Sequence, residues 1–331
     1  MFGYIVRRIV SGLLVLFVVS ISVFALFFYG PSDPALAYCP ETKCTPQRLE
    51  NITEQLGLDR PAVEQYGDYV KGIFVGNDFQ AGAITIKCPA PCLGVSFKLR
   101  LNVTDYLMAR FPATLSLAVG GAVIFLSVGV TLGILAARVR GTTMDKTIVG
   151  ASLFVAAIPY YLLALLAYLI LISQLGIFPD SGYFSPFTDG PLAWAKGMLL
   201  AWLCIGIWSS TTYARFSRGS MVESLNEDYV RTARAKGLSE RRVTMRHALR
   251  AAIVPVITIF GLEFAALLAG TVFTERIFDI QGIGLTALDA IGTRDLPVIS
   301  ATVLIAAAFV VVSNIVVDLV YSAIDPRVRL T

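Results

Sequence analysis

Long apolar stretches alternate along the chain with shorter polar connections. Each stretch holds at least 20 residues, and an α-helix needs ~20 residues to cross the ~30 Å hydrocarbon core of a bilayer. A segment inside lipid must satisfy its own backbone hydrogen bonds, so each stretch is expected to be helical. The six predicted spans are Ile9–Phe28, Thr114–Ala136, Thr147–Ser173, Leu192–Tyr213, Ala251–Thr274 and Val298–Ala323.

The composition agrees with this pattern and excludes an ordinary soluble domain. Apolar residues make up 56% of the chain, charged residues make up 15%, and the mean hydropathy is +0.72. The first stretch follows Arg7-Arg8 and precedes Ala35-Leu-Ala37, an order that resembles a cleaved signal peptide. Its apolar part is longer than the ~7–15 residues of a signal peptide, so a retained helix is expected. The chain is therefore predicted to be an all-α integral membrane protein with six transmembrane helices.

The placement of charge predicts the orientation of these helices. The net charge is only +4, but Lys and Arg gather in alternate connections, whereas the connection Gln174–Pro191 has none and carries Asp180 and Asp189. Basic connections remain on the cytoplasmic side of a membrane, so both termini are predicted to be cytoplasmic. The basic clusters then need no nucleic acid to explain them. They lie at Arg7-Arg8, at Arg138, Arg140 and Lys146, at Arg215–Arg250, and at Arg327 and Arg329.

Residues 31–103 form a polar segment that is predicted to face outward, between an N-terminal helix (residues 1–30) and a membrane core (residues 104–331). It mixes seven Lys or Arg with eight Asp or Glu, and two short helices are expected at Pro46–Leu56 and Ala62–Phe74. A segment of this size has little core of its own, so it is expected to rest on the outer face of the membrane helices.

Four of the five cysteines lie in this external segment, at Cys39, Cys44, Cys88 and Cys92. An even number on the oxidising side of a membrane predicts two disulfides. The pairs Cys39–Cys44 and Cys88–Cys92 are the simplest arrangement, and cross-pairing is the alternative. The spacings also suit a zinc site, although no His or acidic residue lies beside Cys88 and Cys92. Cys204 is expected to be a packing residue in the fourth span.

The most informative polar connection is the basic loop, which we define as Arg215–Arg250. It holds nine Lys or Arg and the single histidine, His247. Met221, Val222, Leu225, Tyr229 and Ala233 are predicted to share one helical face. Gly237 is expected to end this helix and Ser239 to begin the next. Leu238 is expected to be exposed at the turn, and Pro255 is expected to end or kink the second helix.

Two interpretations of the basic loop remain open from the residues alone. A basic helix can lie on anionic lipid headgroups. Its modest apolar face and its two turn signals favour a defined helical hairpin instead, with small residues at the turn that could enter a groove of another protein. The run that carries both signals is Asp228-Tyr-Val-Arg-Thr-Ala-Arg-Ala-Lys-Gly237-Leu-Ser239.

A series of motifs along nearly the whole chain resembles one family. The chain is similar to the permease subunits of ABC importers of the dipeptide/oligopeptide/nickel type, in the branch that contains the first (B-like) permease. The order and spacing of the motifs carry the resemblance. They are Tyr4-Ile-Val-Arg-Arg8, Asp33-Pro34, Gly57-Leu-Asp59 with Pro61, Gln65-Tyr66, Arg110-Phe-Pro-Ala-Thr114, Ile158-Pro159, Asp228–Gly237, Gly282-Ile-Gly284, Arg294-Asp295 with Pro297, Asn314 with Asp318, and Asp325-Pro-Arg327.

The resemblance implies a type I importer permease fold that forms half of a heterodimeric pore in the cytoplasmic membrane of a prokaryote. The implied partners are a second homologous permease, two cytoplasmic ATPases and an external binding protein. The basic loop corresponds to the family's EAA element, whose coupling helix sits in a groove of the ATPase. Asp228 and Arg231 would support the coupling residues, which are Arg234, Ala235, Lys236, Gly237, Leu238 and Ser239. Short peptides are the implied substrate, and nickel chelates, haem or oligosaccharides are the alternatives.

Two features depart from the family pattern. Ala81–Cys92 resembles an insertion that would adapt the outer face to a particular binding protein or substrate. Glu263 lies midway along the fifth span, where relatives often carry Gln. A charge at that depth costs ~2.5–3.5 kcal/mol, so Glu263 is expected to face the interior of the bundle. It is either a polar contact in the translocation path or a structural carboxyl that is protonated or hydrogen-bonded.

The chain carries no Gly-x-x-x-x-Gly-Lys-Ser/Thr motif and no cluster of catalytic residues in the spans. It is therefore expected not to be an enzyme and to bind no cofactor, with ATP and magnesium bound by the ATPase subunits. An ion-gradient carrier is the alternative from another class, but it would show paired intramembrane charges or an inverted repeat. A structural membrane scaffold is a further alternative.

Overall fold

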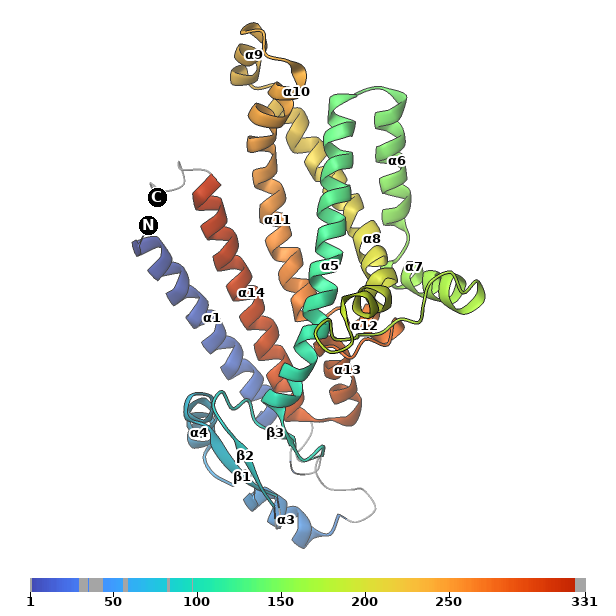
Figure 1. The fold of residues 1–331 in the computed structure, drawn as a ribbon. Helices are drawn as coiled ribbons and strands as arrows, with labels where there is room; N and C mark the ends of the chain where they lie inside the picture. Colours follow the sequence, from blue (N-terminus) through green and yellow to red (C-terminus); the bar gives the residue numbers. More distant parts are fainter. Residues whose placement is uncertain are drawn as a thin grey trace. The chain divides into compact units, whose positions relative to one another are not determined.

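The computed structural model describes residues 2–29, 35, 44–55, 59–81, 84–96 and 98–324. These residues form helices and two small two-stranded sheets (Figure 1). The chain divides into two compact units. The first comprises Met1–Thr114, Ala269–Val272 and Gln281–Val312, and the second comprises Leu115–Leu268, Phe273–Ile280 and Ser313–Thr331.

Five helices of the described chain are long and apolar enough to cross a membrane, and a bent helix pair brings the number to six. The prediction of six transmembrane helices is confirmed. The five long helices are α1 (Phe2–Tyr29), α5 (Val103–Arg138), α8 (Pro191–Leu225), α11 (Leu249–Ala269) and α14 (Leu296–Ile324). The bent pair consists of α6 (Thr143–Ala157) followed by α7 (Tyr160–Ala167) and the π-helix η1 (Tyr168–Gln174).

The third span is not the single straight helix that was predicted over Thr147–Ser173. α6 and α7 meet at an angle of 89°. The bend lies at Ile158-Pro159, where Ile158 is extended, with φ −81° and ψ 124°. Proline has no N–H to donate, and it disfavours the helical conformation in the residue before it. The chain therefore leaves the helix at this point and starts a new one.

The fifth span is also shorter than the predicted Ala251–Thr274, because α11 ends at Ala269. Gly270 follows with φ +120°, and a Cβ built there would lie 2.6 Å from the Cα of Gly284. Only glycine fits both this conformation and this close approach. The chain then forms α12 (Val272–Ile277) and α13 (Ile283–Thr293) before it enters α14.

The external segment packs on α1 within the first unit. It forms α3 (Pro46–Gln55) and α4 (Ala62–Val75), close to the predicted ranges. Tyr66 of α4 contacts α1 through its ring, whose centroid lies 5.2 Å from that of Phe24, and through its hydroxyl, 2.7 Å from the hydroxyl of Ser20. The segment therefore rests against a membrane helix, as predicted.

Two short hairpins and a disulfide complete the external segment. β1 (Asn77–Ala81) pairs with β2 (Ile84–Cys88), and β3 (Val95–Ser96) pairs with β4 (Leu101–Asn102), both in antiparallel register. The predicted Cys88–Cys92 disulfide is present, and both cysteines are buried. Cys39 lies outside the described residues, so its pairing with Cys44 stays a prediction.

Helices α5 and α8 approach each other closely in the second unit. Gly133 of α5 lies so near α8 that a Cβ would come within 2.6 Å of the carbonyl oxygen of Ala214. Nearby, the rings of Phe125 and Tyr213 stack with centroids 4.6 Å apart. Small residues at such contacts let helix backbones approach closely inside a membrane.

Candidate functional site

The basic loop folds as a helix, a tight turn and a second helix at one end of α8 and α11 (Figure 1). α8 ends at Leu225, and α9 (Asp228–Ala235) begins after an extended Glu227. The predicted continuous helical face from Met221 to Ala233 is therefore wrong. Asn226 and Glu227 interrupt the helix, and the chain changes direction there before the turn.

The turn after α9 is the helix end that Gly237 predicted. Gly237 adopts φ +75°, a conformation that favours glycine, and its N–H donates to the carbonyl of Arg234 at 2.9 Å. The Leu238 N–H reaches back to the carbonyl of Ala233 at 3.4 Å. These two bonds have the pattern of a Schellman motif, in which the residue after the glycine packs on the preceding turn. Leu238 is accordingly half-buried rather than exposed, which corrects the prediction for this residue.

Arg234 and Glu240 link the two sides of the turn. The Arg234 Nε lies 2.8 Å from the Glu240 carboxylate, and its Nη1 lies 3.3 Å from the carbonyl oxygen of Leu225. Ser239 occupies the position before α10 (Glu240–Arg242), but its side chain makes no capping bond. Exposed ion pairs contribute only ~0–1 kcal/mol. The pair bridges the turn from α9 to α10.

An apolar cluster under the hairpin makes the basic loop one packed element. It joins α5, α8, α9, the π-helix η2 (Val243–Ala248) and α11, which continues through Pro255. Leu225, Leu238 and Leu249 pack against it from the edge. Its buried members are Ala137, Met221, Val230, Ala233, Val243, Ala248 and Ala252. A displacement of the hairpin would therefore act on the three long helices α5, α8 and α11.

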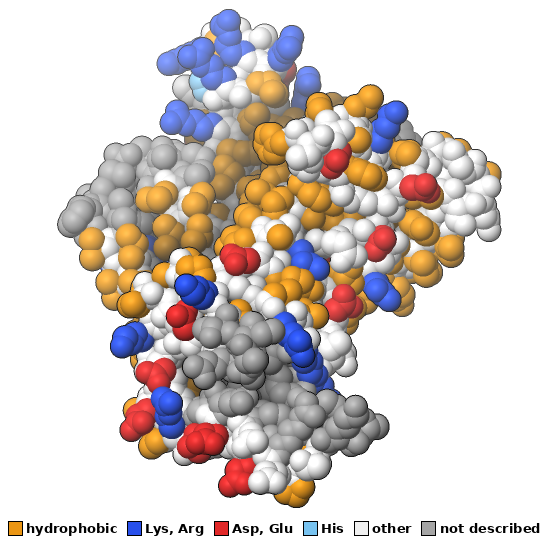
Figure 2. Space-filling view, turned by 60° about the horizontal axis from the view of Figure 1, so that its bottom comes forward, with side chains coloured by type: hydrophobic (Ala, Val, Ile, Leu, Met, Phe, Trp, Pro, Cys, Tyr) orange, Lys and Arg blue, Asp and Glu red, His pale blue; other side chains and the backbone are white. Residues whose placement is uncertain are grey.

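The tip of the hairpin, which we define as Arg234–Ser239, presents small and charged residues to solvent. Ala235, Lys236, Gly237 and Ser239 are exposed, and a Cβ at Gly237 would meet nothing within 4 Å. Figure 2 shows Lys and Arg side chains gathered at this end of the molecule. The predicted supports Asp228 and Arg231 form only a long, exposed pair at 3.4 Å. The tip is thus an unobstructed surface held by rigid elements.

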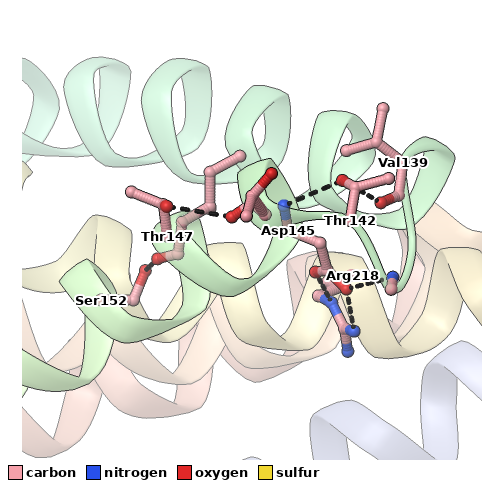
Figure 3. A network of polar contacts seen from close by, with 9 residues as sticks. Val139, Thr142, Asp145, Thr147, Ser152 and Arg218 are labelled. Carbon is pink, nitrogen blue, oxygen red and sulfur yellow. Dashed lines mark hydrogen bonds and ion pairs between the residues drawn. The ribbon is translucent and has the colours of Figure 1, made fainter.

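A partly buried ion pair between α6 and the start of the basic loop was not predicted from the sequence. Asp145, in the first turn of α6, accepts two bonds from the Arg218 guanidinium of α8, at 2.6 Å and 2.8 Å (Figure 3). The Gly141 N–H donates to the same carboxylate at 2.9 Å. Only 5% of the Asp145 side chain is exposed. These residues are 73 positions apart, so no local pattern could have revealed the contact.

Comparison with known families decides what kind of membrane protein carries this site. The family described as "Binding-protein-dependent transport system inner membrane component" matches residues 129–330, and its N-terminal counterpart matches residues 1–118. The chain belongs to this family.

Relatives of this permease match it from end to end. The dipeptide transport system permease protein DppB of Escherichia coli K12 is 33% identical over 351 residues. The di/tripeptide transport system permease protein DppB of Pseudomonas aeruginosa UCBPP-PA14 is 35% identical over 350 residues. Each alignment covers 99% of this chain and 99% of the relative.

A solved structure shares the permease fold. An inward-facing structure of the MetNI methionine ABC transporter matches with a TM-score of 0.54 and 15% identity, over 66% of this chain and 96% of that one. The type I importer permease fold predicted from the sequence is confirmed by this likeness.

Glu263 of the permease lies on α11, within the membrane, and is half-buried. It lies near Tyr213, whose hydroxyl is buried and makes no hydrogen bond among the described residues. The structure thus places a carboxyl group and a phenol together inside the membrane core. Among the described residues, no group of three His, Cys, Asp or Glu could hold a metal ion.

Proposed function

We propose that this chain is a permease subunit of an ATP-driven importer of di- and oligopeptides and forms half of a heterodimeric pore. The observation that carries the proposal is the basic loop, a packed helical hairpin with an exposed tip in a chain that belongs to the binding-protein-dependent permeases. Peptide substrates are supported by the full-length relatives, which are named as dipeptide and di/tripeptide permeases.

The tip would carry the coupling to the ATPase subunits. Its backbone is restrained by the Schellman motif, so it can enter a groove without losing much conformational entropy. The apolar cluster beneath it links the tip to α5, α8 and α11. Closure of two ATPases on ATP would therefore move these helices and open the pathway on alternate sides.

The partners follow from this assignment. A second homologous permease would complete the pore, two ATPases would bind ATP and magnesium at the cytoplasmic face, and an external binding protein would deliver the peptide. Both termini and the basic loop would then lie in the cytoplasm. The external segment, including the Ala81–Cys92 insertion and its disulfide, would lie on the side of the binding protein.

Glu263 is assigned to the translocation path. A carboxyl group at that depth is costly unless it faces a polar cavity or a partner, and functional groups are the usual reason for such a residue. Its half-buried position beside Tyr213 supports a role in contact with passing substrate.

Gentle affinity purification of the chain from native membranes, followed by mass spectrometry, tests the assembly. Recovery of two P-loop ATPases and a second permease is the expected result, and the ligand carried by a co-purified binding protein would distinguish peptides from nickel chelates, haem or oligosaccharides. A chain recovered alone that transports substrate on an ion gradient without ATP would contradict the proposal.

A further inference from the structure

We propose that Asp145 and Arg218 act as a positioning pair that makes α6 move together with α8 when the basic loop is displaced, and so sets how much peptide is transported per ATP. This inference rests on the proposed function, because it concerns the helices that carry the coupling motion. Neither residue belongs to the tip, and neither was singled out by its position in the sequence.

The geometry of the pair is that of a rigid contact. The guanidinium of Arg218 faces the carboxylate of Asp145 with two bonds, from Nε at 2.6 Å and from Nη2 at 2.8 Å. Such two-point contacts fix the orientation as well as the distance between two side chains. The Asp145 side chain is only 5% exposed, so its carboxylate is shielded from water, whereas the Arg218 side chain is 29% exposed and only partly shielded.

The carboxylate is itself held in place from the α5–α6 connection. The Gly141 N–H donates to Oδ2 of Asp145 at 2.9 Å, and Thr142 caps the start of α6 (Figure 3). One turn away, the close approach of Gly133 to Ala214 brings the end of α5 onto the same part of α8. Asp145 therefore links the cytoplasmic ends of α5, α6 and α8 through one buried group.

The pair lies close to the coupling hairpin along α8. Seven residues separate Arg218 from Leu225, which is ~10 Å of helix. At that end, the Leu225 carbonyl accepts a bond from Arg234, and the Ser224 hydroxyl donates to the carbonyl of Ala248 in η2 at 2.8 Å. A displacement of the hairpin thus reaches α8 directly, and the ion pair adds an oriented contact to the packing of α6 on α8.

Stability alone does not explain a pair of this kind. The desolvation of two charges offsets much of their attraction, so an apolar pair of similar volume often stabilises a fold equally well. What an apolar pair does not reproduce is the fixed orientation. The 89° bend lies at the other end of α6, so α7 does not fix the orientation of the end that carries Asp145.

The test uses the full complex reconstituted in proteoliposomes with its binding protein, and it measures peptide taken up per ATP hydrolysed. The variants are Asp145→Asn, Arg218→Gln, the neutral double variant Asp145→Asn/Arg218→Met and the exchanged pair Asp145→Arg/Arg218→Asp. Lys146→Gln is the matched control, because this exposed neighbour loses a charge without touching the pair.

Mutations along a coupled path change the coupling free energy by ~0.5–2 kcal/mol. The amount of peptide taken up per ATP should therefore decrease by a factor of about 2 to about 30 in the single variants and in the neutral double variant. The exchanged pair should recover part of the loss, and Lys146→Gln should match the wild type. The double variant leaves no unpaired charge, so it keeps the test valid if the single variants fail to fold.

A wild-type ratio in the neutral double variant would overturn the inference. Equal losses in all variants, the exchanged pair and Lys146→Gln included, would also overturn it, because the losses would then not depend on the pair. Failure of the proposed function would look different, since wild-type uptake would itself not require ATP.

Discussion

The hydroxyl of Ser96 donates a hydrogen bond to the carboxylate of Asp295, although 199 residues separate them along the chain. Both side chains are buried, and Asp295 is the residue immediately before α14. Beside them, the Lys98 ammonium group donates to the carbonyl of Thr293 at the end of α13. The external segment is thereby joined to the turn between α13 and α14 within one compact unit.

Replacement of Ser96 by Ala should destabilise the attachment of the external segment. The Asp295 carboxylate would lose a buried donor, and an unsatisfied buried group costs ~1–3 kcal/mol. Faster cleavage of the external segment by protease in detergent would report the loss. Ser11→Ala is the control, because that exposed hydroxyl bonds only to a carbonyl of its own helix. Equal cleavage rates in both variants would contradict this role.

Burial raises the pKa of Asp295, and the Ser96 hydroxyl, the nearby Val298 N–H and Lys98 lower it to a smaller extent. A carboxyl group with a raised folded-state pKa contributes most to stability when it is protonated, and it loses that contribution as the pH rises through the folded value. The thermal stability of the wild type relative to Asp295→Asn should therefore decrease as the pH rises above about 4, the usual pKa of an aspartate in an unfolded chain. A difference that is constant above this pH would show that the raised pKa is wrong.

Gly133→Ala should destabilise the second unit. The added Cβ would lie 2.6 Å from the carbonyl oxygen of Ala214 and 2.9 Å from the backbone nitrogen of Arg218. These backbone atoms belong to α8 and cannot move aside. Overpacking of this kind costs ~1–3 kcal/mol. Gly150→Ala is the matched control on α6, where nothing lies within 4 Å and the change should stabilise the helix by up to ~1 kcal/mol. Similar melting temperatures for the two variants would contradict the close contact of α5 and α8.

Glu263→Gln should reduce the uptake of peptides with a cationic side chain more than the uptake of neutral peptides. A carboxylate in the path would attract the cation, and an amide of the same shape would not. The neutral peptide serves as the internal control for folding and coupling. Equal effects on both peptides would assign Glu263 to a structural role beside Tyr213 instead.

The hydrophobic pattern was sufficient to predict the membrane class, the six spans and the helices of the external segment, because these depend on local periodicity and length. It was less reliable at helix ends. Pro159 is a helix-breaking residue, but apolar residues continue on both sides of it. The apolar pattern therefore predicted one span and not the bend at this position. Leu238 was predicted to be exposed, but it is half-buried. Its contact arises from the hydrogen bonds of the Schellman motif, which the residue composition of the turn does not reveal.

Pairing between distant residues could not be predicted. Asp145 lies among the basic residues Arg138, Arg140 and Lys146, and Arg218 is one of nine Lys or Arg residues in the basic loop, so neither has a distinctive local pattern. Their contact, like that of Ser96 with Asp295, depends on how helices pack and leaves no periodic trace in the sequence. The coupling residues were found because Gly237 and its neighbours form a local turn signal and a family motif.

The most direct test of the central claim compares ATP-dependent peptide uptake by the reconstituted complex after two changes at Gly237. Its φ of +75° is tolerated by Asn and is costly for a β-branched residue, by ~1–2 kcal/mol or more. Gly237→Asn should retain most of the uptake, and Gly237→Val should reduce it at least about tenfold while the chain still inserts and binds its partner permease. Uptake by Gly237→Val equal to that of the wild type would contradict coupling through the basic loop.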